Sequence, residues 1–525
     1  MVKVVRRLRR ALVGTAQWAG GRPITEPALP RLALSSWTRA LRSGGVRRRV
    51  LVTAFRNRTW IEWAVYAACQ LRRIGVATTL VYSSAEVRRL YPLAGLPGLE
   101  HLGFWAGVED IPDLRLVDLD EWCPTPEQTA PWREFAREFA PTVAAYDLHV
   151  EENEEGPLAP AYRREVARAE TMLAETGAAL TRILHVNPVS RVVCYSGLIG
   201  RSPALCEAAR RAGVEVLTVE GWAWRPGHMI CNRNAPALEY NVDGWLRAIG
   251  AGDDSTERET ARLLRFQEGT LEEAPPGNLH RVQRTASTAP LPPAVAAFRQ
   301  RPGPSFLLAT NVVGDSSILR RDPIFRSQRA WVRQTVEFFR AHRGWSLVVR
   351  AHPDEAWIRG KVAVRMGEVA REVAGDAPNV LVIGGDEDVS SYALMPGLTA
   401  GLVWISSIGV DMVARGIPVL AAARPKYHGL GIVEEPPHAL AYFDALRRLA
   451  KSGARPTPEQ RAVARRYLNV VFREFSFDAF SPSYRARDLF LEGPGSPPDA
   501  DVFYRIVAGD LPPETPPRRE ASRVA

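Results

Sequence analysis

Two short motifs in the second half of the chain carry side chains suited to binding phosphate. The first, Arg350-Ala351-His352-Pro353, directly follows the apolar segment 346–349, which has the pattern of a buried strand. An arginine offers forked donors with a fixed charge, and a histidine can donate near neutral pH. Proline cannot continue a strand ladder, so Pro353 fixes the turn. Because ligands bind at the carboxyl ends of such strands, we expect Arg350 and His352 to face a ligand.

The second motif is Ser406-Ser407-Ile408-Gly409-Val410-Asp411, followed by Gly416-Ile417-Pro418. Two hydroxyls and a glycine at a strand-to-helix turn present hydroxyl donors and backbone N–H groups at a helix start, where anions bind. Asp411, in the first turn, could compensate the helix dipole or accept a ribose hydroxyl. Serines are also ordinary helix caps, and that alternative stays open.

Taken together, these motifs resemble the capsule polysaccharide biosynthesis glycosyltransferases of the GT-B fold, a group that includes bacterial Kdo transferases. The resemblance is good across about 305–435, looser across 46–240 and absent at both ends. The elements that carry it are Asn311 with Asp315, Arg350 to Pro353, Asp388 with Ser391-Tyr392, Ser406 to Asp411, Gly416 to Pro418, Tyr427-His428-Gly429-Leu430-Gly431 and, in the looser part, Glu220 and Asn232 to Pro236.

The resemblance implies sugar transfer from a nucleotide-sugar donor to a surface polysaccharide or a lipid-linked acceptor. In the related sialyltransferases, His-Pro and Ser-Ser motifs hold the phosphate and ribose of a CMP-sugar, which implies those roles for His352, Ser406 and Ser407 and favours a CMP-linked, Kdo-like donor. Many GT-B enzymes have Glu where this chain has Asp411. The predicted nucleotide-binding set is Arg350, His352, Pro353, Ser406, Ser407, Gly409, Asp411 and Asn311.

The chemistry expected of such a site is electrostatic, since preorganised donors stabilise the charge that develops on the leaving phosphate. We expect neither a metal nor a cofactor. A general base should come from the first half of the chain, within reach of the acceptor hydroxyl. Glu220, after a strand, is the first choice, and Glu62, early in the first helix, is the second; His352 completes the catalytic candidates. The residues predicted to contact substrate are Tyr427, Gly429 and Trp222.

Short apolar strands alternate with longer helices in both halves of the chain, which predicts an α/β protein of two Rossmann-like, doubly wound domains facing a cleft. The predicted parts are a basic amphipathic arm 1–45, an acceptor domain 46–284, a proline-rich linker 285–304, a donor domain 305–475 and a partly disordered tail 476–525. Segment 100–160 is readable only coarsely. We interpret 390–394 as a short helix, and the acidic run 151–155 as a solvated loop.

The positive net charge of the chain is concentrated at its N-terminal end. There are 68 Lys+Arg against 58 Asp+Glu, a net charge of +10, but residues 1–50 hold twelve basic residues and one acid, so the remainder sums to −1. A basic arm with an apolar face predicts contact of residues 1–20 with an anionic membrane surface rather than with nucleic acid. Five cysteines without a C-x-x-C pair favour a reduced compartment. We therefore expect a cytoplasmic protein at the inner face of the cell membrane.

Two other functions share these motifs. Polyol-phosphate transferases of teichoic acid synthesis resemble the same fold and would transfer a phosphate ester from a CDP-polyol; only that reaction adds phosphorus to the acceptor. A non-catalytic GT-B protein would bind a nucleotide without turning it over. Ordinary hydrophobic (46%) and charged (24%) fractions exclude a disordered chain, a collagen-like fibre and a disulfide scaffold.

Overall fold

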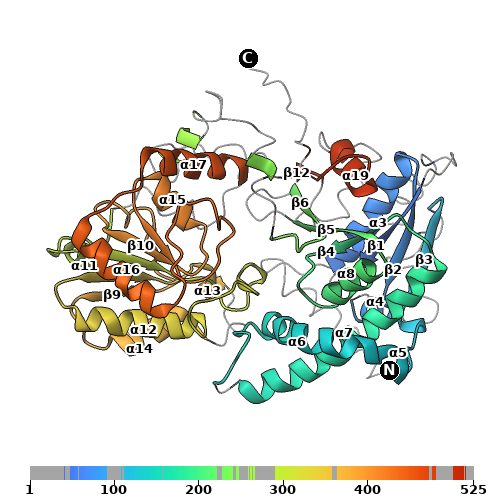
Figure 1. Ribbon diagram of the computed structural model, residues 1–525, viewed down its shortest axis with the longest axis horizontal. Helices are drawn as coiled ribbons and strands as arrows, with labels where there is room; N and C mark the ends of the chain where they lie inside the picture. The colour runs from blue at the N-terminus through green and yellow to red at the C-terminus, as the bar shows by residue number, and fades with distance from the viewer. Residues whose placement is uncertain are drawn as a thin grey trace, which may run out of the picture.

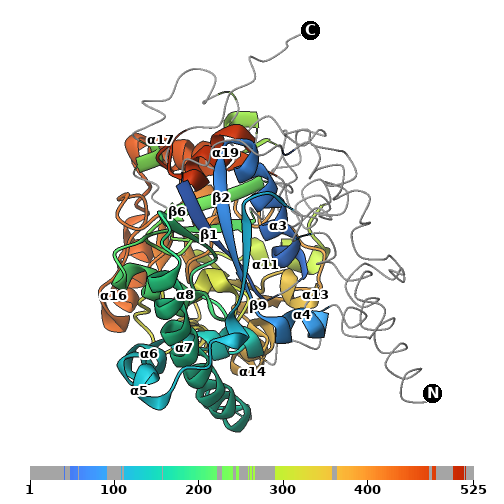
Figure 2. The same ribbon diagram turned by 90° about the vertical axis from the view of Figure 1, so that its right-hand side faces the viewer.

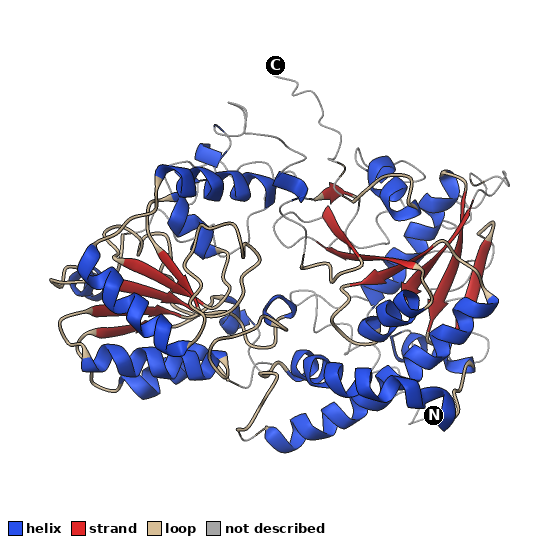
Figure 3. Cartoon of the chain, viewed as in Figure 1, coloured by secondary structure: helices blue, strands red, loops and turns tan. Residues whose placement is uncertain are grey.

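The computed structural model describes residues 41, 48–56, 58–90, 108, 111–156, 158–221, 228–239, 244–246, 258, 260–262, 264–265, 290–357, 364–471, 476–479, 500–513 and 515. Within them the chain forms two α/β domains, each built on its own sheet (Figure 1). Figure 3 shows the two separate groups of strands with helices around each. The predicted fold class is confirmed. The predicted arm lies outside the described residues, apart from residue 41.

The first domain occupies the right of Figure 1. In the described part of the chain its sheet has the order β12-β6-β5-β4-β1-β2-β3, with β6 and β12 antiparallel to their neighbours and the others parallel. Its elements are β1 (Arg48–Ala54), α3 (Arg58–Arg73), β2 (Val76–Tyr82), α4 (Ser84–Leu90), β3 (Leu114–Asp118), η3 (Leu119–Glu121), α5 (Pro126–Thr129), η4 (Ala130–Trp132), α6 (Arg133–Leu148), α7 (Ala159–Val186), β4 (Arg191–Tyr195), α8 (Ser202–Arg211), β5 (Glu215–Gly221), β6 (His228–Arg233), β12 (Phe477–Asp478) and α19 (Ala500–Ala508).

The second domain has a parallel sheet of order β11-β10-β7-β8-β9 among the described residues. Its elements are α11 (Pro293–Arg299), β7 (Ser305–Ala309), η6 (Ser316–Ile318), α12 (Gln328–Ala341), β8 (Ser346–Arg350), α13 (Asp354–Trp357), α14 (Met366–Ala374), β9 (Val380–Ile383), β10 (Ala400–Val403), α15 (Ile408–Ala414), β11 (Val419–Ala421), α16 (Ala439–Ser452) and α17 (Pro458–Asn469).

Alternation along the central strands explains why both sheets are covered on both faces. In β1, Val50 and Val52 belong to the core on the α3 side, whereas Leu51 belongs to the core formed with α6, α7 and α8. Figure 2 shows α3 on one side of these strands and α8 on the other. In β7, Leu307 and Leu308 divide in the same way between two cores. Strands buried on both faces read as continuous apolar runs, which is why the sequence pattern located them.

Both sheets place a reversal of strand order next to their first strand. In the first domain the order reverses between β1 and β4, and in the second between β7 and β10. The loops that leave two such strands run to opposite faces of the sheet, so their carboxyl ends form the usual ligand-binding position. In the first domain these loops begin at Phe55 and Ser196, and in the second at Thr310 and Trp404. Any site must therefore be sought around these four loops.

Three segments differ from expectation. Helix α11 (Pro293–Arg299) lies inside the predicted linker, and Arg299 donates from Nη2 to the carbonyl of Pro396 in the second domain (2.5 Å). Residues 391–394 form a turn and not the expected short helix. Segment 476–525, expected as a tail, contributes β12 and α19 to the first domain, where α19 packs beside α3. No described helix is long and apolar enough to span a bilayer.

The acidic run 151–155 is not a solvated loop. It lies between α6 and α7 of the first domain and pairs with arginines of the second domain. Arg329 donates from Nη2 to Glu154 Oε2 (2.7 Å), and its backbone N–H donates to Glu151 Oε1 (2.9 Å). The backbone N–H of Arg320 donates to Glu152 Oε2 (3.1 Å), and Arg326 pairs with Glu155. These contacts hold the two domains together.

The backbones of the two domains also approach closely beside these ion pairs. Gly314, at φ +73°, lies against α6, and a Cβ at this position would stand 2.5 Å from Cα of His149. Only a residue without a side chain fits such an approach, and a positive φ favours glycine as well. Arg320 covers the ring of Phe139 at 4.1 Å from its centroid. The loop after β7 is therefore fixed against the first domain by shape as well as by charge.

We predict that Arg329→Ala destabilises the protein by about 3–5 kcal/mol, because it leaves the Glu154 carboxylate, 1% exposed, without its cation. The matched control is Arg333→Ala on the same helix, whose partner Glu372 is 65% exposed, and it should change stability by less than about 1 kcal/mol. Urea denaturation of both variants measures the difference. Equal stability of the two variants would contradict the role of Arg329.

Candidate functional site

The loop after β7 organises the carboxyl edge of the second sheet. The backbone N–H of His352, after β8, donates to Thr310 Oγ1 (3.1 Å), and that of Ile405, after β10, donates to Asn311 Oδ1 (3.4 Å). Gln328 holds Asn311 in turn, through hydrogen bonds to its backbone N–H and carbonyl (3.0 and 2.9 Å). Asn311 is thus a positioning residue at the reversal point, because its side-chain oxygen accepts a backbone hydrogen bond from the loop after β10.

His352 is oriented as a hydrogen-bond donor. The backbone N–H of Asp354 donates to Nδ1 of the ring (3.1 Å), so Nδ1 acts as an acceptor and the ring proton is on Nε2. Pro353 starts the turn into α13, where the N–H of Ala356 donates to its carbonyl (3.1 Å). The ring is 35% exposed, which leaves it accessible to a ligand. The site therefore presents an N–H at the carboxyl end of β8.

Arg350 differs from expectation. Its side chain is 4% exposed, and its guanidinium donates to the carbonyls of Gly384 and Glu387, in the second case at 3.2 Å. Burial lowers the pKa of this arginine, while Glu387 and Asp388 oppose that shift. Arg350 thus fixes the 384–388 loop to the end of β8, and it does not present its donors to a phosphate.

Ser406 and Ser407 are half-buried at the start of α15, and neither hydroxyl bonds to a described residue. The backbone of Ser406 is held by Tyr427, whose hydroxyl donates to its carbonyl (2.7 Å). That contact requires Gly409, since a Cβ there would lie 2.4 Å from the Tyr427 hydroxyl. Tyr427, expected to bind substrate, is 1% exposed and positions the serine turn from inside. Gly429, after it, is exposed at φ +79°.

Asp411 also differs from expectation. The residue is 2% exposed on the inner side of α15, with Oδ1 3.8 Å from Nη1 of Arg415. Arg415 donates to the backbone carbonyl of Asp411 as well (3.1 Å). The carboxylate is an internal partner of an arginine one turn later, and this placement keeps it from a ribose.

Glu220, the predicted base, ends β5 in the first domain and lies where the two domains meet. Its Oε2 is buried and accepts no hydrogen bond from a described residue. Burial raises the pKa of Glu220 to about 8, Lys426 lowers it and Asp315 raises it further. Lys426 and Asp315 both belong to the second domain. The carboxyl ends of β5 and of the second sheet are therefore within electrostatic reach of each other.

Lys426 is a site residue that we did not predict. It follows β11 and is within electrostatic reach of Glu220, Asp315 and Arg321. Burial lowers the pKa of Lys426 to about 8, Arg321 lowers it further, and the two acids raise it. A signal was present, because only four of the 68 basic residues in the chain are lysines. A lysine changes its proton affinity on burial far more readily than an arginine. Its position directly before Tyr427 made it a candidate.

Two tyrosines of the first domain, Tyr146 and Tyr195, are within electrostatic reach of Glu220. The rings of Trp60 and Tyr195 lie 3.8 Å apart between centroids. Burial raises the pKa of Tyr195 and of Tyr146, and Glu220 contributes to both shifts. Glu62, the second predicted base, is buried within α3. Trp222, predicted to stack on a sugar, lies outside the described residues.

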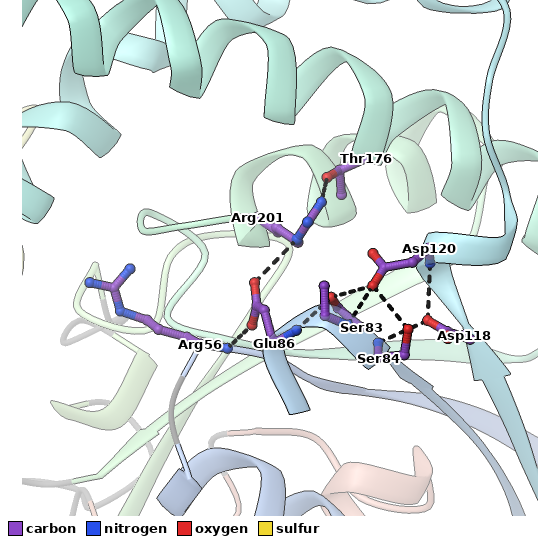
Figure 4. Close-up of polar contacts among 9 residues, drawn as sticks. Arg56, Ser83, Ser84, Glu86, Asp118, Asp120, Thr176 and Arg201 are labelled. Carbon is purple, nitrogen blue, oxygen red and sulfur yellow. Dashed lines mark hydrogen bonds and ion pairs between the residues drawn. The ribbon is translucent and has the colours of Figure 1, made fainter. Parts of the chain in front are cut away.

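Asp-x-Asp triplets, which can bind a divalent metal, occur at 118–120, 386–388 and 499–501, although we expected a site without a metal. Asp118 Oδ1 accepts from the N–H of Ser84 (3.0 Å), and Asp120 Oδ2 accepts from Ser83 Oγ and from the N–H of Ala85 (both 2.8 Å). Figure 4 shows both carboxylates turned toward the start of α4. The first triplet therefore caps a helix. No group of three or more metal-ligating side chains occurs among the described residues.

No protein-family model and no curated protein matches the chain. Solved structures similar to it include the KpsC beta Kdo 2,4 transferase of Thermosulfurimonas dismutans, with 17% identity, coverage of 53% of this chain and 79% of that chain, and a TM-score of 0.34. The UDP-GlcNAc 2-epimerase of Neisseria meningitidis has 11% identity, coverage of 81% and 97%, and a TM-score of 0.26. A Streptomyces glycosyltransferase complexed with thymidine diphosphate has 13% identity, coverage of 84% and 99%, and a TM-score of 0.21.

The raised pKa of Glu220 predicts a particular pH dependence of stability. Because the folded-state value, about 8, lies above the ordinary 4.5, the folded protein holds this proton longer than the unfolded chain. The stabilisation is complete below about pH 4.5 and is lost as the pH rises toward about 8. Relative to Glu220→Gln, the free energy of unfolding of the wild type should fall by a few kcal/mol across this pH window. A tenfold difference in proton affinity between the folded and unfolded states equals about 1.4 kcal/mol.

Urea unfolding of both proteins between about pH 5 and pH 9 checks this expectation. Glu175→Gln, on the exposed face of α7, is the control and should run parallel to the wild type. A constant difference between Glu220→Gln and the wild type across the range would show that Glu220 is not a group with a raised pKa.

Proposed function

We propose that this protein is a glycosyltransferase that moves a sugar from a nucleotide-sugar donor to a saccharide acceptor. The observation that carries the proposal is the arrangement at the two reversal points. The carboxyl edge of the second sheet carries His352, Ser406 and Ser407. Glu220, at the carboxyl edge of the first sheet, is within electrostatic reach of Lys426 and Asp315 of the second domain. Sugar transfer needs stabilisation of a leaving phosphate and removal of an acceptor proton, and each domain offers side chains for one of these tasks.

The donor nucleotide belongs to the second domain. His352 offers Nε2–H, and Ser406 and Ser407 offer hydroxyl groups at the start of a helix. As the bond between the sugar and the phosphate breaks, these groups stabilise the negative charge that builds on the phosphate oxygen. A CMP-linked donor of the Kdo type is our first choice. Arg350, Asn311 and Asp411 act behind this surface as structural residues.

The acceptor belongs to the first domain. Its hydroxyl oxygen forms the new bond to the anomeric carbon and gives its proton to the Glu220 carboxylate. With a pKa of about 8, Glu220 is mostly protonated at neutral pH, and Lys426 favours the ionised form that a base requires. Transfer should therefore become faster as the pH rises toward about 8. Neither a metal nor a cofactor takes part in this proposal.

We predict that His352→Ala weakens nucleotide binding by about tenfold, because a hydrogen bond to a charged phosphate contributes about 1.5–3 kcal/mol. Thermal shifts with CMP, UDP, GDP and their sugars measure the effect, since ligand binding stabilises the folded state. The matched control is His438→Ala, whose Nδ1 also accepts a helix N–H, from Ala441 (3.2 Å), at the start of α16. The donor site is wrong if the nucleotide response of His352→Ala equals that of the wild type.

A lipid-linked or surface polysaccharide acceptor agrees with the basic arm, which would hold the enzyme at the inner face of the cell membrane. Deleting residues 1–20 should release the protein from vesicles containing anionic lipid and leave nucleotide-induced thermal shifts unchanged. Each basic residue near such a surface contributes about 1 kcal/mol, so binding should fall by orders of magnitude. Sedimentation with vesicles measures it, and unchanged partition of the deletion variant would exclude the arm as the anchor.

A further inference from the structure

A strained arginine stands at the reversal point of the first domain. Arg56 follows β1 and has φ +83°, a left-handed conformation that is costly for a residue with a side chain. Such conformations persist where the surroundings impose them, and they cluster at ligand sites. The loop containing Arg56 is one of the four loops at which the topology places a ligand.

Glu86 holds this conformation. Its Oε2 accepts from the backbone N–H of Arg56 (2.6 Å), and its Oε1 accepts from Nε of Arg201 (3.4 Å). Arg201 is anchored in turn by Thr176 of α7, to whose hydroxyl it donates from Nη1 (2.8 Å). Figure 4 shows the chain of contacts from Thr176 to the backbone of Arg56. Both carboxylate oxygens of Glu86 accept hydrogen bonds. In a glutamine, one of these oxygens would be an NH2 group, which would face the N–H of Arg56 or of Arg201 and could not accept its hydrogen bond.

The guanidinium of Arg56 points away from Glu86 (Figure 4). Its Nη2 pairs with Asp147 (2.9 Å), and its Cζ stands 4.4 Å from the centroid of the Tyr146 ring. Nε and Nη1 have no acceptor among the described residues, and the side chain is 25% exposed. Gly200 leaves room for Nη1, since a Cβ there would lie 3.3 Å away. Two donors of a held guanidinium are therefore open to a ligand.

The Arg56 guanidinium and the Glu220 carboxylate are both within electrostatic reach of Tyr146 and Tyr195. Arg56 lowers and Glu220 raises the pKa of both tyrosines, and the Tyr195 ring is tilted by 33° against that of Trp60. A fixed guanidinium matches a planar carboxylate or a phosphate, with forked donors giving direction as well as charge.

We infer that Arg56 forms an anion subsite for the acceptor, which is a saccharide carrying a carboxylate or a phosphate, and that Glu86 is the positioning residue of this subsite. The inference rests on the proposed function, because it assigns the acceptor to the first domain. Neither residue belongs to the donor-binding surface around His352. Failure of this subsite would therefore leave nucleotide binding intact.

Isothermal titration tests the subsite with three probes: glucose, glucuronate and glucose 6-phosphate. The wild type should bind the charged probes more tightly than glucose, and the two charged probes distinguish a carboxylate from a phosphate. Arg56→Ala should weaken the charged probes by about tenfold or more and leave glucose unchanged. Arg56→Lys, which keeps the charge and loses the fork, should fall between the two proteins. Arg210→Ala, at an exposed arginine paired with Glu207, is the control and should equal the wild type.

Glu86→Gln should weaken the same probes, and a double-mutant cycle separates positioning from general destabilisation. If Glu86 acts through Arg56, Glu86→Gln adds little to Arg56→Ala. Additive losses would overturn the positioning role. Equal binding of charged probes by wild type and Arg56→Ala, or no preference of the wild type for charge, would overturn the subsite. In that case, normal nucleotide-induced thermal shifts in these variants would show that the donor site is intact although the Arg56 subsite does not exist.

Discussion

The position of the two domains relative to each other depends on one interaction, the pairing of Arg329 with Glu151 and Glu154 of the other domain. The site that we propose draws on both sheets, because the donors of the second sheet and the carboxyl group of the first lie in different domains. The ion pairs between 151–155 and 320–329, with the close approach at Gly314, set how these halves meet. The influence of Lys426 on the pKa of Glu220 follows from that arrangement.

Much of the fold could be predicted from the sequence because its strands are buried on both faces. The apolar run 346–349 locates a strand, β8 (Ser346–Arg350), within one residue. Strands β3, β6 and β12 were not predicted. Strand β3 lies in the segment that could be read only coarsely, and β12 is two residues long and pairs with a strand far away in sequence. The same limit applies to the acidic run, because its arginine partners are more than 160 positions away.

The sequence predicts where the residues of the candidate site lie, but only in part what each side chain does. A strand end identifies which residues are near the edge of a sheet, and His352, Ser406 and Glu220 lie there. Local pattern does not tell where a long side chain turns, and Arg350 turns inward to the 384–388 loop while Asp411 turns toward Arg415. Lys426 was overlooked because a single lysine forms no motif; its importance comes from burial beside Glu220.

The return of the chain to its starting domain has a mechanical consequence. After α17 the polypeptide passes back from the second domain, where β12 extends the first sheet and α19 covers α3. Among the described residues, the second domain therefore lies between two parts of the chain that build the first domain. This insertion, together with the ion pairs between 151–155 and 320–329, limits how far the domains can move apart.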